Sequence, residues 1–396
     1  MHSSAFRYAL FALLYFVQGA IMSFFTALNA IYLLSFNVTM SQVGLMGLLV
    51  MLPFVLKIFL GILSDKVSLL GLGYRKPYII LGLLLQALCL VAAVYIDPGT
   101  HFWLYALTGF LLMTGMALYD TTTDGLALDT TRPSEEGTVQ GLMVGARALG
   151  VVVISAVIGT LAESSSWQAA FWFLALITLL PLLLVFKLRE TGKSSQNAFD
   201  WHAFSSFKAL PIIALGVFGA LYSLIINGTN QIVNPFFQEV FNFGPQKLGL
   251  FTMLWGIGVV AGSISGGKLV DSIGKKRSVF LSIAIAFITI LLFVIIRTPL
   301  LAVLAVIVFG VGYGFYETVY FALSMQRTDP RIAASMFSIL MAVANIGTGV
   351  GMALTGSLVD GVGYPPTFLI IALLNLLALP LLPLIFKAVA PRHRSD

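Results

Sequence analysis

Charged side chains are scarce along this chain: they make up 10% of its 396 residues, against about 25% in an ordinary soluble domain. Apolar residues make up 59%, and the mean hydropathy is +0.99. A water-soluble fold needs a polar surface that this composition does not supply. The sequence therefore predicts a protein that lies in a lipid bilayer for most of its length.

Cysteine and histidine are almost missing as well. The one cysteine, Cys89, excludes a disulfide framework, and the four histidines are scattered over predicted loops and termini without the spacing of metal ligands. No nucleophile, base and orienting residue can be combined into a catalytic group. We therefore expect no metal site, no cofactor and no enzymatic reaction.

A phosphate-binding loop is also excluded. Residues 262–268 have the spacing G-x-x-x-x-G-K, but Leu269 stands where serine or threonine must follow. The segment also lies in a predicted membrane helix rather than after a strand. Transport driven by ATP is therefore not expected.

Long apolar runs are what the chain has in abundance. A helix crosses a hydrocarbon core of about 30 Å with about 20 residues, and twelve such runs are centred near residues 20, 53, 87, 115, 150, 176, 222, 258, 287, 312, 345 and 375. The first run follows Arg7 without a cleavage site and is expected to stay in the protein as a helix. The predicted fold is an all-α membrane protein of twelve transmembrane helices.

The basic residues predict the orientation of these helices. Eighteen of the 22 lysines and arginines fall at one predicted membrane face, so both termini are expected to be cytoplasmic. Because these residues are spread over many short loops, no nucleic-acid partner is expected. We expect a monomer in the plasma or inner membrane.

Two halves of six helices are predicted, residues 1–187 and 209–396, with a cytoplasmic linker over residues 188–208. Tyr119-Asp120-Thr121 in the first half returns as Tyr316-Glu317-Thr318 in the second, with a shift of 197 that also aligns Gly150 with Gly347. The linker is either a plain connection or a short interfacial helix, in which Trp201, Phe204 and Phe207 share one face. The chain is therefore a duplicated membrane protein.

A second repeated pattern stands at the inner ends of predicted helices 2 and 8. It reads G-x-x-x-D followed by two basic residues, and its members are Gly61, Asp65, Arg75 and Lys76 in the first half and Gly267, Asp271, Lys275 and Lys276 in the second. In this pattern the chain resembles the major facilitator superfamily. The resemblance implies that these residues form gating loops, and that helices 1, 4, 7 and 10 line a solute site near the midplane between parallel halves.

Three stretches of the first half narrow the resemblance. They are Tyr15-Phe-Val-Gln18-Gly19, residues 53–65 followed by Gly73-Tyr-Arg-Lys-Pro-Tyr78, and Asp120-x3-Asp124-x4-Asp129. They resemble the folate-biopterin transporter branch and its relatives, which include light-harvesting assembly proteins of the PucC type. The resemblance implies secondary transport of a small polar or amphipathic organic solute or, as the alternative, a non-transporting assembly or pigment-handling role.

Five charged residues fall inside predicted helices, where a charge at the bilayer centre costs about 2.5 to 3.5 kcal/mol on insertion scales. Matching depths predict a pair between Asp120 and Arg147 and another between Lys57 and Asp124. Glu317 is then the acid without a base. The sequence predicts proton coupling at Glu317 together with Asp120 and Asp124, with pairs that only fasten helices as the alternative.

Uncharged polar side chains on the cavity helices predict the solute site, because amides bind a polar solute without the cost of a fixed charge. The alternative is that they bond to neighbouring helices. The candidates are Gln18, Thr26, Asn29, Tyr119, Asn227, Asn230, Gln231, Asn234, Tyr316 and Asn345. Glycines at four-residue spacing predict close helix packing instead, and these are Gly258, Gly262 and Gly266, and Gly141 and Gly145.

Overall fold

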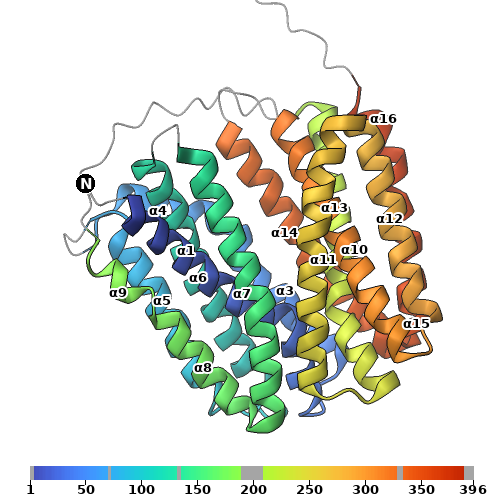
Figure 1. Ribbon diagram of the computed structural model, residues 1–396, viewed down its shortest axis with the longest axis horizontal. Helices are drawn as coiled ribbons and strands as arrows, with labels where there is room; N and C mark the ends of the chain where they lie inside the picture. The colour runs from blue at the N-terminus through green and yellow to red at the C-terminus, as the bar shows by residue number, and fades with distance from the viewer. Residues whose placement is uncertain (1–3, 70–72, 132–134, 189–207, 328–332, 388–396) are drawn as a thin grey trace, which may run out of the picture.

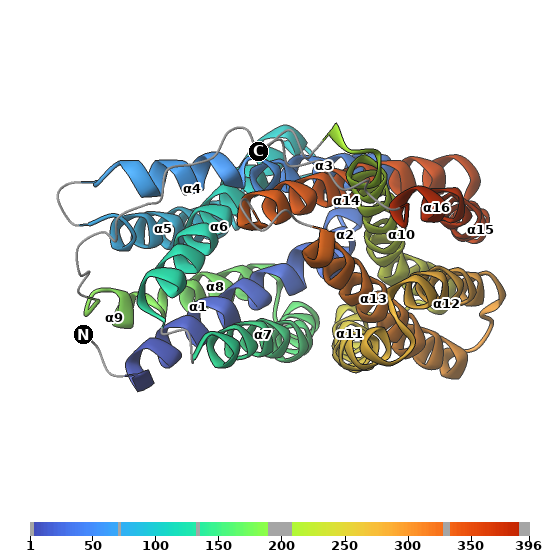
Figure 2. The same ribbon diagram turned by 90° about the horizontal axis from the view of Figure 1, so that it is seen from above.

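A computed structural model of the protein describes residues 4–69, 73–131, 135–188, 208–327 and 333–387. All regular structure in this part of the chain is helical, as the sequence predicts. Figures 1 and 2 show two helix bundles side by side, with the first half in blue and green and the second in yellow to red. Helices dominate because a segment in hydrocarbon has to satisfy its backbone groups internally.

The first half crosses the membrane six times. Its crossings are, in order, α1 (Ser4–Ser23) continued by the π-helix η1 (Phe24–Leu28) and α2 (Asn29–Leu34); α3 (Met40–Val55) with α4 (Lys57–Lys66); α5 (Lys76–Ala93); α6 (Phe102–Thr130); α7 (Glu136–Ser164); and α8 (Trp167–Leu179) with α9 (Leu182–Val185).

The second half repeats this arrangement, and its first five crossings are single helices. Its crossings are α10 (Leu210–Phe241), α11 (Pro245–Ile273), α12 (Lys275–Ile295), α13 (Pro299–Arg327), α14 (Ala333–Val362), and α15 (Tyr364–Asn375) continued by η5 (Leu376–Leu381) and α16 (Leu382–Ile385). The predicted interfacial helix of the linker lies outside the described residues.

Eleven of the twelve predicted crossings are helical segments long and apolar enough to span a bilayer, and the second crossing is the exception. Its helix is interrupted at Leu56, a turn residue between α3 and α4. Pro53 lacks the N–H that would continue the hydrogen-bond ladder, and proline is the usual cause of such a break. The break places Lys57 at the start of α4.

The two halves meet along two pairs of helices. Helix α3 of the first half packs on α14 of the second, and α7 of the first half packs on α11 of the second. We call the face at which α1 begins the inner face, since it is the predicted cytoplasmic one, and the opposite face the outer face. In Figure 1 the inner face is at the top, and the halves meet near the lower, outer ends of these helices.

Glycines allow helices to approach closely in the second half. A Cβ atom added at Gly258 or Gly262 of α11 would lie 2.5 or 2.0 Å from a backbone oxygen of α13, and at Gly266 it would lie 3.2 Å from Phe315 Cα. The predicted packing role of this series is confirmed. Gly145 differs from the prediction, because a Cβ there would meet nothing within 4 Å.

Candidate functional site

Two aspartates of α6 share one lysine inside the first half. Lys57 Nζ bonds to Asp120 Oδ2 and lies 3.4 Å from Asp124 Oδ2. From α1, Gln18 Nε2 donates to Asp120 Oδ1 at 3.0 Å, and the Tyr15 hydroxyl donates to Asp124 Oδ1. We call these five residues the acid cluster.

The charged side chains of the acid cluster differ in how much of their surface is exposed. The Asp120 side chain is 5% exposed, whereas those of Lys57 and Asp124 are 31% and 40% exposed. Because Lys57 Nζ lies 3.4 Å from Asp124 Oδ2, the predicted pair of these two residues is confirmed. The predicted pair of Asp120 with Arg147 is wrong, because the helix break at Leu56 brings Lys57 to Asp120 and α6 presents both carboxylates to it.

Glu317 stands in a different environment in the middle of α13. It forms no hydrogen bond or ion pair with any residue that the structure describes, and it is partly exposed. The cation whose charge acts on it is Arg147, which also acts on Tyr313 of the second half and Tyr15 of the first. Arg147 thus lies between the halves, and no ion pair within 4 Å holds it to a described acid.

The repeat explains why Glu317 has no cation of its own. The shift of 206 that aligns Gly61 with Gly267 puts Ser263 at the position of Lys57, and the shift of 197 puts Ala344 at the position of Arg147. The second half therefore has no basic side chain at either place. The two copies of the repeated motif carry acids with different chemistry.

Near Glu317, the amide of Asn227 is fully engaged. Its Nδ2 donates to the carbonyl and hydroxyl oxygens of Ser223, both at 3.1 Å, and to Thr348 Oγ1 at 3.2 Å. Its Oδ1 accepts from the Tyr313 hydroxyl at 2.7 Å. Asn227 therefore ties α10 to α13 and α14, as the alternative reading of these amides predicts.

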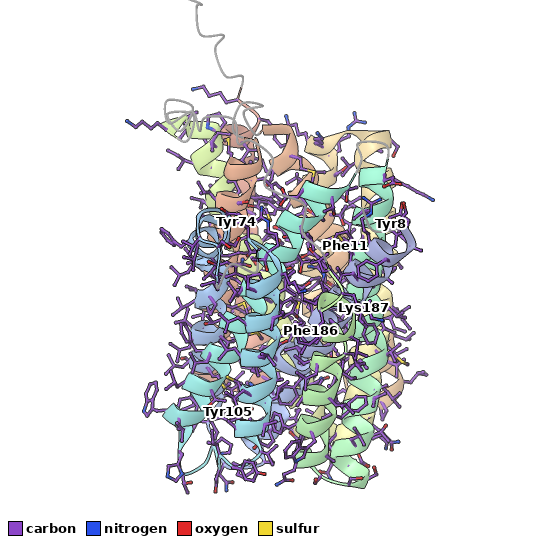
Figure 3. All side chains as sticks on the ribbon, turned by 90° about the vertical axis from the view of Figure 1, so that its left-hand side faces the viewer. Tyr8, Phe11, Tyr74, Tyr105, Phe186 and Lys187 are labelled. Atoms are coloured by element: carbon purple, nitrogen blue, oxygen red, sulfur yellow. The ribbon has the colours of Figure 1, made fainter. Side chains whose placement is uncertain are left out.

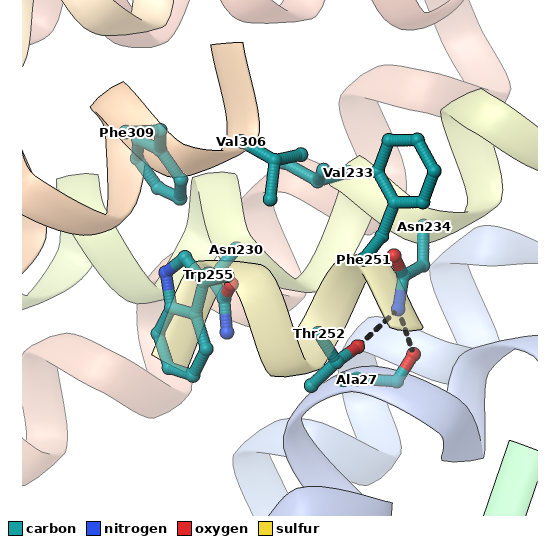
Figure 4. Close-up of a pocket in the computed structure, with 9 residues that line it drawn as sticks. All are labelled: Ala27, Asn230, Val233, Asn234, Phe251, Thr252, Trp255, Val306 and Phe309. Atoms are coloured by element: carbon teal, nitrogen blue, oxygen red, sulfur yellow. Dashed lines mark hydrogen bonds between the residues drawn. The ribbon is translucent and has the colours of Figure 1, made fainter. Parts of the chain in front are cut away.

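A pocket lies farther out, where α10 meets α11, α13 and the π-helix of the first crossing (Figure 4). Asn234 Nδ2 donates to the Ala27 carbonyl at 3.0 Å and to Thr252 Oγ1 at 2.9 Å, so it joins the two halves. Asn230 and Trp255 line the same pocket, and Asn230 forms no hydrogen bond with a described residue. Asn230 is therefore the amide in this pocket without a hydrogen-bond partner among the described residues.

A second pocket lies where η1, α2 and α3 meet α10 and α14, and three more of the predicted residues line it. Thr26, Asn29 and Gln231 line it together with Met352. Their polar groups have partners: Asn29 Oδ1 accepts from Tyr105 at 2.9 Å, and Gln231 Nε2 donates to the Met352 carbonyl at 3.0 Å. Thr26 bonds back to its own helix.

The repeated tyrosines do not face a cavity. The Tyr119 ring is 1% exposed and packs on α5 next to Gly82. Tyr316 is 0% exposed, and its hydroxyl donates to Asn375 Oδ1 of α15 at 3.3 Å. Both rings are thus buried inside their own half, whereas Asn345 is partly exposed and bonds to no described residue.

The inner loop of the first half is built around Arg75. Its Nε lies 2.9 Å from Asp129 Oδ2 of α6, and its Nη1 donates to Ser64 Oγ at 3.0 Å. Lys76 Nζ donates to the carbonyls of Phe186 and Leu188 at 2.8 and 3.1 Å. Figure 3 shows Tyr74 of this loop toward the inner end and Tyr105 toward the outer end.

The remaining predicted loop residues are described only in part. The side chains of Asp65 and Asp271, and the surroundings of Gly61, lie outside the described residues. Lys276 is exposed and Lys275 half-buried at the start of α12, and Gly267 touches only Thr318, 4.0 Å from an added Cβ. The gating role of these residues stays a prediction.

Two side chains that bond to predicted site residues, or lie one turn from them, are not among the candidates from the sequence. Tyr15 binds Asp124, and its place three residues before Gln18, on the same face of α1, is a signal that could have found it. Tyr313 binds Asn227 and stands four residues before Glu317 on α13. Both hydroxyls lie within one helical turn of a predicted site residue.

Comparison with known proteins agrees with the helical fold. The family model of the Major Facilitator Superfamily matches residues 11–339. The drug efflux pump JefA of Mycobacterium tuberculosis is 27% identical over 162 residues, which are 41% of this chain and 32% of the pump. The folate-biopterin transporter of Synechocystis is 28% identical over 190 residues, which are 46% of this chain and 37% of that protein.

Each of these matches spans only about a third of the relative's own length. Among solved structures, the nucleoside transporter NupG superposes with a TM-score of 0.80 at 17% sequence identity, covering 98% of this chain and 100% of that one. At this identity the likeness shows the fold alone.

Proposed function

Because the chain belongs to the Major Facilitator Superfamily, we propose that it is a secondary transporter that couples the movement of a small organic solute to protons through Glu317. The observation that carries this proposal is the contrast between the acids inside the membrane. Asp120 and Asp124 share Lys57, whereas Glu317 forms no bond with a described residue. A carboxylate without a fixed partner is free to exchange a proton.

Arg147 supplies the second part of the coupling. Glu317 of α13 lies 10 residues from the inner end of its helix, and Arg147 of α7 lies 11 residues from the inner end of its own. At 1.5 Å per residue, the two are at nearly the same depth on opposite halves. An ionised Glu317 attracts Arg147 and draws the halves together there, and protonation removes that attraction.

The solute is proposed to be polar or amphipathic, because the amides without described partners near the interface are uncharged, and the charges of Glu317 and Arg147 have opposite signs. Asn230 and Asn345 offer amides without described partners, and Trp255 offers a flat apolar face beside Asn230 (Figure 4). The resemblance to the folate-biopterin branch adds pterins and folates to the candidate solutes. Nucleosides and drug-like compounds, named for the other relatives, are also candidates.

Transport into vesicles with an imposed pH gradient tests the proposal. Purified protein is first screened for thermal stabilisation by biopterin, folate, uridine, glucose and ethidium, and the compound that stabilises it is used for uptake. One pH unit drives an accumulation of about tenfold for each coupled proton. Glu317→Gln is expected to abolish this accumulation and to leave exchange of labelled for unlabelled solute intact, because a glutamine cannot bind and release a proton.

The matched control is Glu239→Gln, which removes an exposed acid of the same half at the outer end of α10. It is expected to accumulate solute like the parent protein. Unchanged accumulation in the Glu317→Gln protein would show that this carboxylate does not couple protons to transport.

A further inference from the structure

The outer ends of the two halves are joined by hydrogen bonds from carboxylates to helix N-termini. Asp360, near the end of α14, accepts from the backbone N–H groups of Met40 and Ser41 at 3.1 and 2.7 Å. Glu163, near the end of α7, accepts from the N–H of Gln246 at 2.8 Å. In each case the acid belongs to one half and the helix N-terminus to the other.

These two contacts are copies of one another. Glu163 and Asp360 are related by the shift of 197 that relates the repeated motifs, within Gly159-Thr-Leu-Ala-Glu163 and Gly356-Ser-Leu-Val-Asp360. Their partners Ser41 and Gln246 are related by a shift of 205. The duplication therefore produced the same inter-half contact twice.

Glycines one turn before each acid bring the helices close enough for this contact. A Cβ atom added at Gly159 would lie 2.5 Å from the Pro245 carbonyl oxygen, and one added at Gly356 would lie 2.1 Å from that of Met40. Met40 and Pro245 are again related by 205. The backbones are thus nearly in contact, and the following acid reaches over the end of the partner helix.

At both helix ends the other half satisfies backbone N–H groups that the helix itself leaves without a partner. The first N–H groups of a helix have no partner within it, and Gly244, the N-cap residue of α11, has no side chain to offer. In α3 the Thr39 side chain accepts from the backbone N–H of Gln42, and Asp360 satisfies the N–H groups of Met40 and Ser41, which precede it. A carboxylate at this place also interacts favourably with the helix dipole.

We propose that Glu163 and Asp360, with Gly159 and Gly356, form an outer clasp that holds the outer side of the transporter closed and sets how often it opens. The hydrogen bonds between the halves support this role. Among described residues, all of them lie in the outer part of the protein, in the clasp and at Asn234. The clasp therefore stabilises the outer-closed arrangement and must break before the outer side opens.

The two copies are unequal in strength. Asp360 accepts two bonds, whereas Glu163 accepts one, because the residue before Gln246 is Pro245 and proline has no N–H to donate. Loss of Asp360 is therefore expected to shift the equilibrium farther than loss of Glu163. For a solute that binds from the outside, a larger outer-open fraction raises the apparent affinity in proportion.

Distances between spin labels on the two halves test the clasp in the full-length protein. Cys89, the single cysteine, is buried and is first replaced by alanine. Labels are then attached through Thr100→Cys and Thr298→Cys, two exposed positions on the outer face. A second pair, Ser68→Cys and Ser272→Cys, reports on the inner face.

The double variant Glu163→Ala and Asp360→Ala is expected to change the populations seen by the outer label pair. The ratio of molecules with a long outer distance to those with a short one should rise roughly tenfold or more, since hydrogen bonds to charged groups are lost at both places. The inner distance is expected to shorten in the same molecules. Asp97→Ala is the matched control: Asp97 also accepts a backbone bond on the outer face, from Gly99 at 2.8 Å, but within its own half. It is expected to leave both distances unchanged.

Distances that do not change in the double variant, or that change as much in the Asp97→Ala control, would overturn the proposal. Where the alanine variants do not fold, Glu163→Gln and Asp360→Asn remove the charge, keep the side-chain shape and are expected to give a smaller shift in the same direction. The readout is a distance, so the result does not depend on whether Glu317 couples protons.

Discussion

Replacing Lys57 with methionine is expected to destabilise the protein by about 3 kcal/mol, the low end of the range for breaking a buried ion pair. Lys57 is the only base that bonds to Asp120 and Asp124 among the described residues. Without it, Asp120 loses its cationic partner at a place where its side chain is 5% exposed. The low end applies because Lys57 and Asp124 are partly exposed.

Thermal unfolding of the purified protein in detergent measures this loss. The midpoint of the Lys57→Met protein is expected to fall, because both aspartates lose the cation that they share. Adding Asp120→Asn and Asp124→Asn is expected to restore much of the stability. Lys208→Met, at an exposed lysine, is the control that should leave the midpoint unchanged.

An unchanged midpoint in the Lys57→Met protein would mean that the acid cluster contributes nothing to the fold. A loss that the two asparagine substitutions do not reverse would mean that Lys57 acts by packing rather than by charge. The rescue therefore separates the two possible sources of the effect.

A single methyl group at Gly262 is expected to have the second large effect. The Cβ of Gly262→Ala would lie 2.0 Å from the Val311 carbonyl oxygen, a backbone atom that cannot move without shifting α13. Overpacking of this kind costs about 1 to 3 kcal/mol, occasionally more. We expect a lower unfolding midpoint and a smaller yield of monodisperse protein.

Gly145→Ala is the matched change in a helix of the other half. A Cβ at Gly145 meets nothing within 4 Å, and alanine favours a helix over glycine by about 1 kcal/mol. Its midpoint is expected to equal or exceed that of the parent protein. Equal midpoints for the two alanine proteins would contradict the helix spacing described for α11 and α13.

The difference between these two glycines shows the limit of the four-residue pattern. The spacing of Gly258, Gly262 and Gly266 predicts a packing surface, and the structure confirms it. Gly141 and Gly145 have the same spacing, yet the surroundings of Gly145 are open. Spacing places residues on one face of a helix, but it does not say whether another helix covers that face.

The acids show the same limit at the site. Depth along the predicted helices favours a pair of Asp120 with Arg147, because a single sequence gives the depth of a residue but not the direction in which its side chain points. The structure assigns Lys57 to Asp120 instead, because the helix break after Pro53 turns the lysine toward α6. The repeat still identified Glu317 correctly as the acid without a described base, since a missing lysine is visible in the sequence itself.

The sequence by itself determined that this protein crosses the membrane many times, that it is a duplicated helical protein, and which few residues carry charge within it. Those features follow from composition, run length and repeats, which are local properties of the chain. Only the tertiary structure decided which charges meet, which amides remain free, and that Glu163 and Asp360 cap helices of the opposite half. These contacts depend on how helices far apart in the chain face one another, and no one-dimensional pattern contains that information.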